Sequence, residues 1–451
     1  MRLLFISLSV LFLSGESVAQ LAAGPMVGHV AMREANIWLQ TDGPGKEVKV
    51  TAIREGDPNS QPITAMALAS GPYAGFTSVP LKASVGVSDI RTANVLKFAF
   101  TGLEPGQSYV YDVSVDGVPV RLDHSTRFIT QSLWQHRNDP PEFSFLAGSC
   151  AYVNEEAYDR PGKSYGGDYG IYSSMDKEMA DMMLWLGDNT YLREVDWDSR
   201  SGILHRFSHS RALKEARPLL ARMPNYAIWD DHDHGPNDSD RSYPFRQNTL
   251  EAFNLFWANA GADATGQGGI TNTFRFNDCD FFLLDNRWFR SAPDSTGQIL
   301  GEAQIRWLME ALRFSDAPFK FVCVGGQVLN TSAVYENHAV FAKERRRLLH
   351  HIDSLRIGNV IFLSGDRHHS EVSRYTGPNG TVIHDLTISP LTSKASEKPK
   401  EEVNLNQVAN SYITQRNYGL ITISGPRKAR ELTLRLKDVR GKELYSFVLK
   451  Q

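Results

Sequence analysis

Beyond residue 142 the chain alternates apolar runs of strand length with amphipathic stretches of helix length, and this alternation most constrains its fold. The apolar runs are 143–147, 182–186, 226–229, 281–284, 319–324 and 360–363. Helices are predicted at 169–180, 211–222, 248–259 and 302–314. The last is the clearest, because its apolar residues recur every 3.6 residues on one face. This pattern predicts an α/β domain with a largely buried β-sheet.

The N-terminal third has a different pattern. Short alternating runs at 36–40, 48–52, 96–100 and 109–115 are separated by turns that contain glycine or proline. This predicts a β-sandwich of the fibronectin or immunoglobulin type. We therefore expect a two-domain α+β protein, with the β-sandwich at 24–132 and a catalytic α/β domain at 142–451.

The first nineteen residues are typical of an export signal. Arg2 precedes an apolar run at 3–13, and small residues at 17–19 allow cleavage before Gln20. The alternative is that these residues form a buried first strand or an uncleaved membrane anchor. We predict a Sec-type signal peptide at 1–19, a secreted or periplasmic protein, and no transmembrane anchor elsewhere.

Charge and cysteine content narrow the function classes further. The formal net charge of −3 gives no general attraction to nucleic acid, so we expect no stable nucleic-acid binding. The three cysteines leave at least one thiol unpaired. Cys279 and Cys323 lie in strand-like runs and are interpreted as buried thiols, whereas Cys150 follows a strand in a polar setting.

Acidic, histidine and cysteine residues follow directly after several predicted strands. The clusters lie at 148–150, 187–191, 230–237, 325–327 and 364–369. Ligands of open α/β sheets bind beyond the carboxyl ends of strands, so we expect these clusters to converge on one site. A single cluster of this kind could also be a solvated polar loop.

The residue types of the clusters indicate metal ions. Carboxylates and imidazoles exceed what one acid–base pair needs, and the side chains at 230–233 would repel one another without cations or hydrogen bonds. The pattern predicts a hydrolase with two or more metal ions, a type of site used for in-line attack at phosphorus. No G-x-S-x-G elbow, P-loop or zinc-finger cysteine spacing is present.

The clusters also occur in the order of a known motif set. Gly187-Asp188-x-x-Tyr191, Trp229-Asp230-Asp231-His232-Asp233 and Ser364-Gly365-Asp366-Arg367-His368, with the earlier Ser149-Cys150, resemble the motifs of PhoD-like alkaline phosphatases. That family belongs with the calcineurin-like metallophosphoesterases. The resemblance implies a metallophosphoesterase-type α/β sandwich, with central β-sheets flanked by helices, placed after an N-terminal β-module.

The resemblance also implies Fe³⁺ and Ca²⁺ as cofactors, with other divalent metals as alternatives. It assigns the ferric ion to Cys150, Asp188, Tyr191 and His368, with Asp188 bridging to the divalent ion. Thiolate and tyrosinate donors favour a trivalent ion. If they do not bind metal, Tyr191 would be an aromatic side chain at the rim of the site, and Cys150 would be a small buried residue.

The remaining roles follow from the same resemblance. Divalent-metal ligands are expected at Asp231, Asp366 and Asn237, and the catalytic residues are expected to be His232 and Arg367. Gln327 is a further possible contact, Asp230 is expected to orient its neighbours, and Asp233 replaces the more usual glutamate. His205, His209 and His369 are expected to be structural or exposed.

The implied function is an alkaline-phosphatase-type hydrolase, in which metal-bound hydroxide attacks the phosphorus of phosphomonoesters and of some diesters. The expected partners are small phosphate esters, including phospholipid or nucleotide diesters. One alternative is a phosphodiesterase or phospholipase D-type hydrolase. Another is a catalytically silent surface-binding protein.

Overall fold

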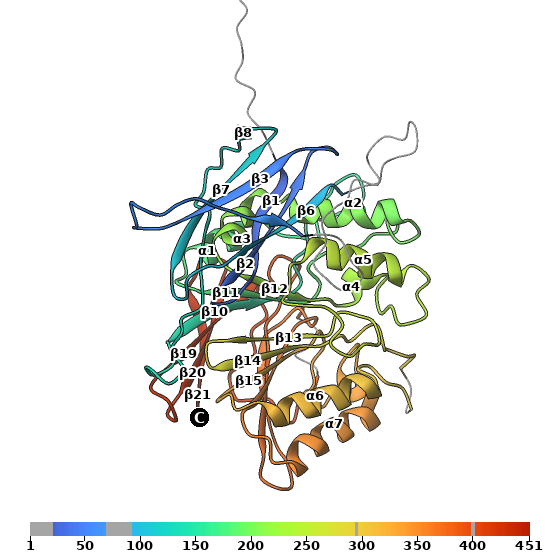
Figure 1. The fold of residues 1–451 in the computed structure, drawn as a ribbon. Coiled ribbons are helices and arrows are strands. Elements are labelled where there is room, and N and C mark those ends of the chain that lie inside the picture. Colours follow the sequence, from blue (N-terminus) through green and yellow to red (C-terminus); the bar gives the residue numbers. More distant parts are fainter. Residues whose placement is uncertain (1–20, 69–92, 294–295, 398–401) are drawn as a thin grey trace, which may run out of the picture.

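The computed structural model describes residues 21–68, 93–293, 296–397 and 402–451, whose arrangement Figure 1 shows. The predicted signal peptide at 1–19 lies outside these residues. Within the described part of the chain, no helix is both long enough and apolar enough to cross a membrane. The described strands form four sheets.

The N-terminal strands form two sheets whose inner faces share one hydrophobic core. One sheet has the order β1 (Leu21–Val30), β2 (Glu34–Thr41), β6 (Val95–Thr101) and β5 (Met66–Ala67). The other has the order β4 (Ile63–Thr64), β3 (Val48–Arg54), β7 (Ser108–Val115) and β8 (Val118–Pro119), with β9 (Arg127–Ile129) also paired to β7. The four strand runs predicted for this region lie within β2, β3, β6 and β7.

The first of these sheets packs onto the rest of the chain. Trp38 donates its indole N–H to the carbonyl oxygen of Leu255 across 2.8 Å. The buried ammonium group of Lys97 donates to the carbonyl oxygen of Asn254 across 2.6 Å. Side chains of β1, β2 and β6 also belong to the largest hydrophobic core of the molecule. Hydrogen bonds and a shared hydrophobic core therefore hold the N-terminal sheet against the rest of the chain.

Two six-stranded sheets form the centre of the remaining chain. The first has the order β12 (Asn225–Ile228), β11 (Met182–Leu186), β10 (Phe143–Gly148), β19 (Asn417–Ser424), β20 (Glu431–Asp438) and β21 (Glu443–Lys450). The second has the order β13 (Asn272–Phe276), β14 (Cys279–Leu283), β15 (Lys320–Cys323), β16 (Val360–Ser364), β18 (Val382–Thr387) and β17 (Glu371–Thr376). Phe145 packs edge-on against Phe281 and Phe321 of the second sheet, with ring centroids 5.4 and 5.1 Å apart. The predicted α/β architecture is confirmed.

Helices cover the outer faces of these sheets. On the second sheet, α6 (Glu302–Phe314) and α7 (Ala342–Ser354) bury an apolar stripe against the strands. Figure 1 shows these two helices near its lower edge. The observed bounds of α6 match the prediction. The other helices are α1 (Gly170–Asp176), α2 (Arg200–Arg211), α3 (Arg217–Arg222), α4 (Asp231–His234) and α5 (Arg246–Phe256), with 3₁₀ turns η2 (Lys214–Ala216) and η3 (His338–Phe341).

The prediction of one helix over 211–222 was wrong. Arg211 ends α2, and α3 starts only at Arg217, with Pro218 in its first turn. Proline lacks a backbone N–H and is tolerated at the start of a helix but not in its interior. Pro218 therefore separates the two helices. The helix at 200–211 was not predicted, because its serine, glycine and histidine residues obscure the helical period.

Candidate metal centre

The carboxyl ends of β10, β11, β12 and β16 bring the predicted clusters together. These four strands end at Gly148, Leu186, Ile228 and Ser364, within two to four residues of the polar side chains. Several of those residues have a left-handed backbone, with φ values of 58° for Cys150, 52° for Asp188, 67° for Asp366 and 55° for His368. This conformation is uncommon for residues that carry a Cβ, and it turns each side chain away from its strand direction.

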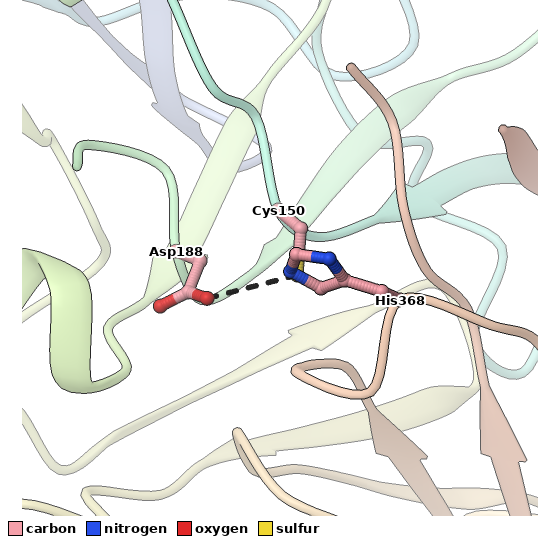
Figure 2. A group of neighbouring side chains, drawn as sticks. All are labelled: Cys150, Asp188 and His368. Carbon is pink, nitrogen blue, oxygen red and sulfur yellow. Dashed lines mark hydrogen bonds between the residues drawn. The ribbon is translucent and has the colours of Figure 1, made fainter. Parts of the chain in front are cut away.

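A first group of donors consists of Cys150, Asp188 and His368, whose ligand atoms all lie within 4.8 Å of one another. Figure 2 shows the three side chains converging from separate segments, with the Cys150 thiol 3.7 Å from Oδ2 of Asp188. The hydroxyl group of Tyr191 lies 3.2 Å from that oxygen and 3.3 Å from Nε2 of His368. The four side chains assigned to the ferric ion by resemblance thus surround one point.

The electrostatics of this group are unfavourable without a cation. Burial, together with the charge of Asp366, raises the pKa of the Cys150 thiol to about 12. Burial and the charges of Asp231 and Cys150 raise the pKa of Asp188 well above its ordinary value. Burial also lowers the pKa of His368 to about 4, so its imidazole is neutral, as a metal ligand must be. A bound cation would favour the ionised thiol and carboxylate.

Further donor groups are linked to the first through shared carboxylates. Asp188 also groups with Asp231 and His232, and Asp231 groups in turn with Asp230 and Asp366. Oδ2 of Asp230 and Oδ1 of Asp231 are buried and have no hydrogen-bond partner among the described residues. Buried carboxylate oxygens are normally satisfied, so these two fit a site for a cation.

Sequence reasoning missed a fourth group and its counter-charges. Asp238 and Glu336 lie with Asp231, their ligand atoms within 4.8 Å of one another. Glu336 is buried and pairs with Arg287 and Arg290. Arg287 follows β14 but is a cation, and Arg290 and Glu336 lie further from a strand end. A search for acidic, histidine and cysteine clusters after strands therefore did not identify them.

Asp233 lies outside all the donor groups. Its carboxylate accepts backbone N–H groups from Asn189, Thr190 and Asp230, at 3.2, 2.8 and 3.1 Å. The contact with Asp230 belongs to a capping box at the start of α4. Asp233 therefore caps the short helix that carries Asp231 and His232.

A cavity of about 710 Å³ opens over the donor groups. Its walls include His232, Asn237, Asp366 and Arg367, so both predicted catalytic residues face it. The imidazole of His232 stacks on Tyr191 with ring centroids 4.3 Å apart. Asn237 is exposed at the rim.

Arg367 is fixed at the wall of this cavity. Its guanidinium donates to Oδ1 of Asn337 across 2.9 Å and to both carboxylate oxygens of Glu402, each across 2.9 Å. It also lies over the ring of Tyr335, 4.7 Å from the centroid. The side chain is 5% exposed, so it is held in a defined position beside the cavity.

Gln327 does not reach the cavity. Its amide donates to Oε1 of Glu371 across 2.6 Å and to Thr387 across 2.9 Å in the protein interior. The expectation of a site contact was wrong, because the chain turns inward after β15. His369 is buried behind the site and its Nδ1 lies 3.0 Å from the carbonyl oxygen of Arg367, in line with a structural role.

The polar stretch 392–406 contributes to the site in its described parts. The carbonyl oxygen of Lys394 lies 2.8 Å from Nδ1 of His368, which fixes the ring orientation. The hydroxyl of Ser393 donates to the Tyr191 hydroxyl across 3.0 Å. The composition of this stretch did not predict its contacts with the site, because lysine, serine and glutamate are also typical of exposed loops.

Comparison with known proteins agrees with this geometry. The sequence model of the family described as PhoD-like phosphatase matches residues 145–426. Alkaline phosphatase D of Bacillus subtilis (strain 168) is 23% identical over 388 residues, which are 71% of this chain and 64% of that protein. A solved structure of PhoD shares the fold, with a TM-score of 0.71 and 17% identity over 97% of this chain and 90% of that one. The family match spans more than half of the chain, which therefore belongs to the PhoD-like phosphatase family.

Proposed function

We propose that the protein is an exported, metal-dependent phosphoric ester hydrolase of the alkaline phosphatase type. The observation that carries this proposal is the continuous series of donor groups, joined by Asp188 and Asp231, beneath an open cavity of about 710 Å³. Sites with several cations suit phosphate esters, because the ions neutralise charge on both the attacking and the leaving oxygen. Membership of the PhoD-like phosphatase family supports the same activity.

The donor chemistry fits two kinds of ion. We assign Fe³⁺ to Cys150, Asp188, Tyr191 and His368, where thiolate and phenolate donors favour a trivalent cation. We assign Ca²⁺ or another divalent cation to Asp188, Asp231, Asp366 and Asn237, whose ligands are oxygen atoms. When bound, such ions acidify water and neutralise phosphate charge.

The protein side chains then have distinct tasks. His232 faces the cavity and can donate a ring N–H to a phosphoryl oxygen. Arg367 supplies a fixed positive charge at the wall, since Asn337 and Glu402 hold its guanidinium in place. Asp230, paired with Arg287, holds the start of α4 and thereby orients Asp231.

The chain organisation and location are part of the proposal. We assign 24–132 to a fibronectin- or immunoglobulin-like β-sandwich domain and 142–451 to a metallophosphoesterase-type catalytic domain. The shared core of the two N-terminal sheets and the two facing six-stranded sheets support this division. The apolar run near the start of the sequence supports export, to the periplasm or the medium.

A phosphodiesterase is the second candidate function. A cavity of about 710 Å³ leaves room for organic groups on either side of a phosphate. Rates on 4-nitrophenyl phosphate and bis(4-nitrophenyl) phosphate, measured side by side at alkaline pH, distinguish the two. The same assay with a chelator tests metal dependence.

We expect hydrolysis of at least one of the two esters, loss of activity on chelation, and recovery when metal is restored. Activity that persists after complete removal of metal would contradict the proposed function. A folded, metal-loaded protein that hydrolyses neither ester would instead indicate a surface-binding role.

A further inference from the structure

A second cavity, of about 300 Å³, adjoins the cavity of the metal centre. Tyr165, His232 and Asn237 line both cavities, so the two meet at a shared wall. His232 also belongs to a donor group that includes Asp188. A phosphate ester bound at those donors would therefore have the second cavity directly beside it.

Aromatic side chains form much of this second cavity. Tyr152, Tyr165 and Tyr191 lie together on its wall, with ring centroids 4.8 Å apart for Tyr152 and Tyr165 and 4.9 Å apart for Tyr152 and Tyr191. The indole of Trp197 completes the aromatic lining. Tyr165 is 40% exposed, so its ring has free surface to offer a ligand. Aromatic rings favour offset-stacked or edge-to-face packing with another flat ring.

Two polar groups at the cavity have no hydrogen-bond or ion-pair partner among the described residues. The indole Nε1 of Trp197 is buried and has no hydrogen-bond partner within the described part of the chain. Lys163 is exposed and forms no ion pair with the described residues. By contrast, the guanidinium of Arg193 is already held 3.4 Å from Asp159 and stacks on Tyr152. A buried indole N–H usually has an acceptor, and because this one is buried, an acceptor on a ligand reaches it only when the Trp197 ring turns as the ligand binds.

We infer that this cavity binds a flat aromatic ring bearing hydrogen-bond acceptors, carried by the organic group of the phosphate ester. A nucleoside is the chemical class that combines a flat ring, ring acceptors and attachment to phosphate. This inference rests on the proposed function and narrows its substrates to esters with such a group. The rings of Tyr165 and Trp197 pack against the base, and the Trp197 N–H and Lys163 contact its acceptors.

An acyl chain fits the cavity less well. Lipid tails require a long apolar groove, whereas charged side chains of Asp159, Arg160, Lys163 and Glu194 stand at this cavity. A methylene chain there would take water from these charged groups and offer Lys163 no acceptor in exchange. The volume of about 300 Å³ lies at the small end of ligand cavities, which suits a single ring system.

The test compares adenosine 5′-monophosphate with glycerol 2-phosphate, an ester without a ring, on the metal-loaded protein. Trp197→Phe removes the indole N–H but keeps a flat ring, and Lys163→Ala removes the cation. In each variant we expect KM for the nucleotide to rise about three- to tenfold, the effect of one lost hydrogen bond. KM for glycerol 2-phosphate should stay unchanged. Trp307→Phe, in the partly buried Trp307 of α6, and Lys177→Ala, at an exposed lysine, are the matched controls.

Equal changes on both substrates, or no change on either, would overturn the inference while leaving the proposed function intact. If neither monoester is hydrolysed, the rate on bis(4-nitrophenyl) phosphate decides the proposed function, and calorimetric binding of free adenosine decides the cavity assignment. Binding that weakens in Trp197→Phe but not in Trp307→Phe supports an aromatic-ring site. Absence of adenosine binding, or equal weakening in both variants, excludes it.

Discussion

The guanidinium group of Arg287 donates from Nε to Oδ1 of Asp230 across 2.6 Å, and neither side chain has any exposed surface. The same guanidinium also donates from Nη1 to Oε1 of Glu336 across 2.6 Å. A single buried cation thus holds two buried carboxylates at the edge of the candidate metal centre. Because arginine stays charged even when buried, it can offset part of the acidic cluster without depending on bound metal.

Removing this cation should destabilise the fold. Arg287→Leu leaves Asp230 without its buried cation and leaves Glu336 with Arg290 alone, and breaking a buried pair costs about 3–5 kcal/mol. Urea unfolding of the metal-free protein measures the change in the free energy of unfolding. Arg306→Leu, at an exposed position of α6, should change it little. A value for Arg287→Leu close to that of the Arg306 variant would contradict the structural role of the pair.

Loss of the Tyr191 hydroxyl should remove an ion without unfolding the chain. Tyr191→Phe keeps the ring that stacks on His232 but deletes the oxygen next to Asp188 and His368. We expect metal affinity to fall about tenfold or more. Tyr152→Phe, whose hydroxyl donates to Asp159, should retain the metal. Elemental analysis of both purified variants, with circular dichroism to check folding, measures the difference, and equal metal content in the two would refute the assignment.

Alkaline pH should weaken the metal-free protein. Burial raises the pKa of Asp233 from 3.8 to about 8 and places that of Asp188 well above its ordinary range. The unfolded chain has released these protons by neutral pH, whereas the folded metal-free chain retains them. Stability therefore falls as the pH rises through the range between the unfolded and folded pKa values, up to about pH 8.

Bound cations favour the ionised form of Asp188 and so reduce this loss. Thermal unfolding midpoints at several pH values from about 6.5, where histidines are already largely neutral, to about 9 test the prediction. The metal-free midpoint should fall more steeply with pH than the metal-loaded one. Parallel curves would show that these carboxyl groups are not linked to metal binding.

The contact between the N-terminal sheet and the catalytic region depends on a close backbone approach. A Cβ added at Gly28 would lie 2.4 Å from the Cβ of Ala258 and 2.7 Å from its carbonyl oxygen. Gly28→Ala should therefore force β1 away from this segment and lower the free energy of unfolding by about 1–3 kcal/mol. Gly43→Ala, where nothing lies within 4 Å of the added atom, is the control. Equal stabilities of the two variants would argue against tight docking.

The strand-end pattern predicted much of the site. Cys150, Asp188, Asp231 and Asp366 were identified because each follows an apolar run, and parallel strands deliver their carboxyl ends to one edge. However, a position after a strand does not fix the direction in which the side chain points, and the side chain of Gln327 points into the protein interior. The left-handed backbone that directs the side chains of Cys150, Asp188, Asp366 and His368 is likewise not encoded by residue type alone.

The strand-end pattern did not predict the buried charges that offset the acidic cluster. Arg287 and Glu336 are far apart in sequence and meet only because the segments after β14 and β15 pack together. The family resemblance identified the candidate metal ligands. Neither the resemblance nor the composition indicated which buried cation offsets their negative charge. Likewise, Pro218 marks the start of α3, whereas the weak helical period of α2 gave no sign of the helix that precedes it.

Asp188 belongs to two neighbouring donor groups, so metal stoichiometry is the measurement that most sharply distinguishes a bridging ligand from a single-ion ligand. Wild-type protein and Asp188→Asn, both reconstituted with iron and calcium, should be compared by elemental analysis together with phosphatase rates. We expect at least two ions per wild-type chain, and loss of more than one ion along with the activity in the variant. A variant that retains its full metal content, or loses a single ion and keeps its activity, would contradict the bridging role of Asp188.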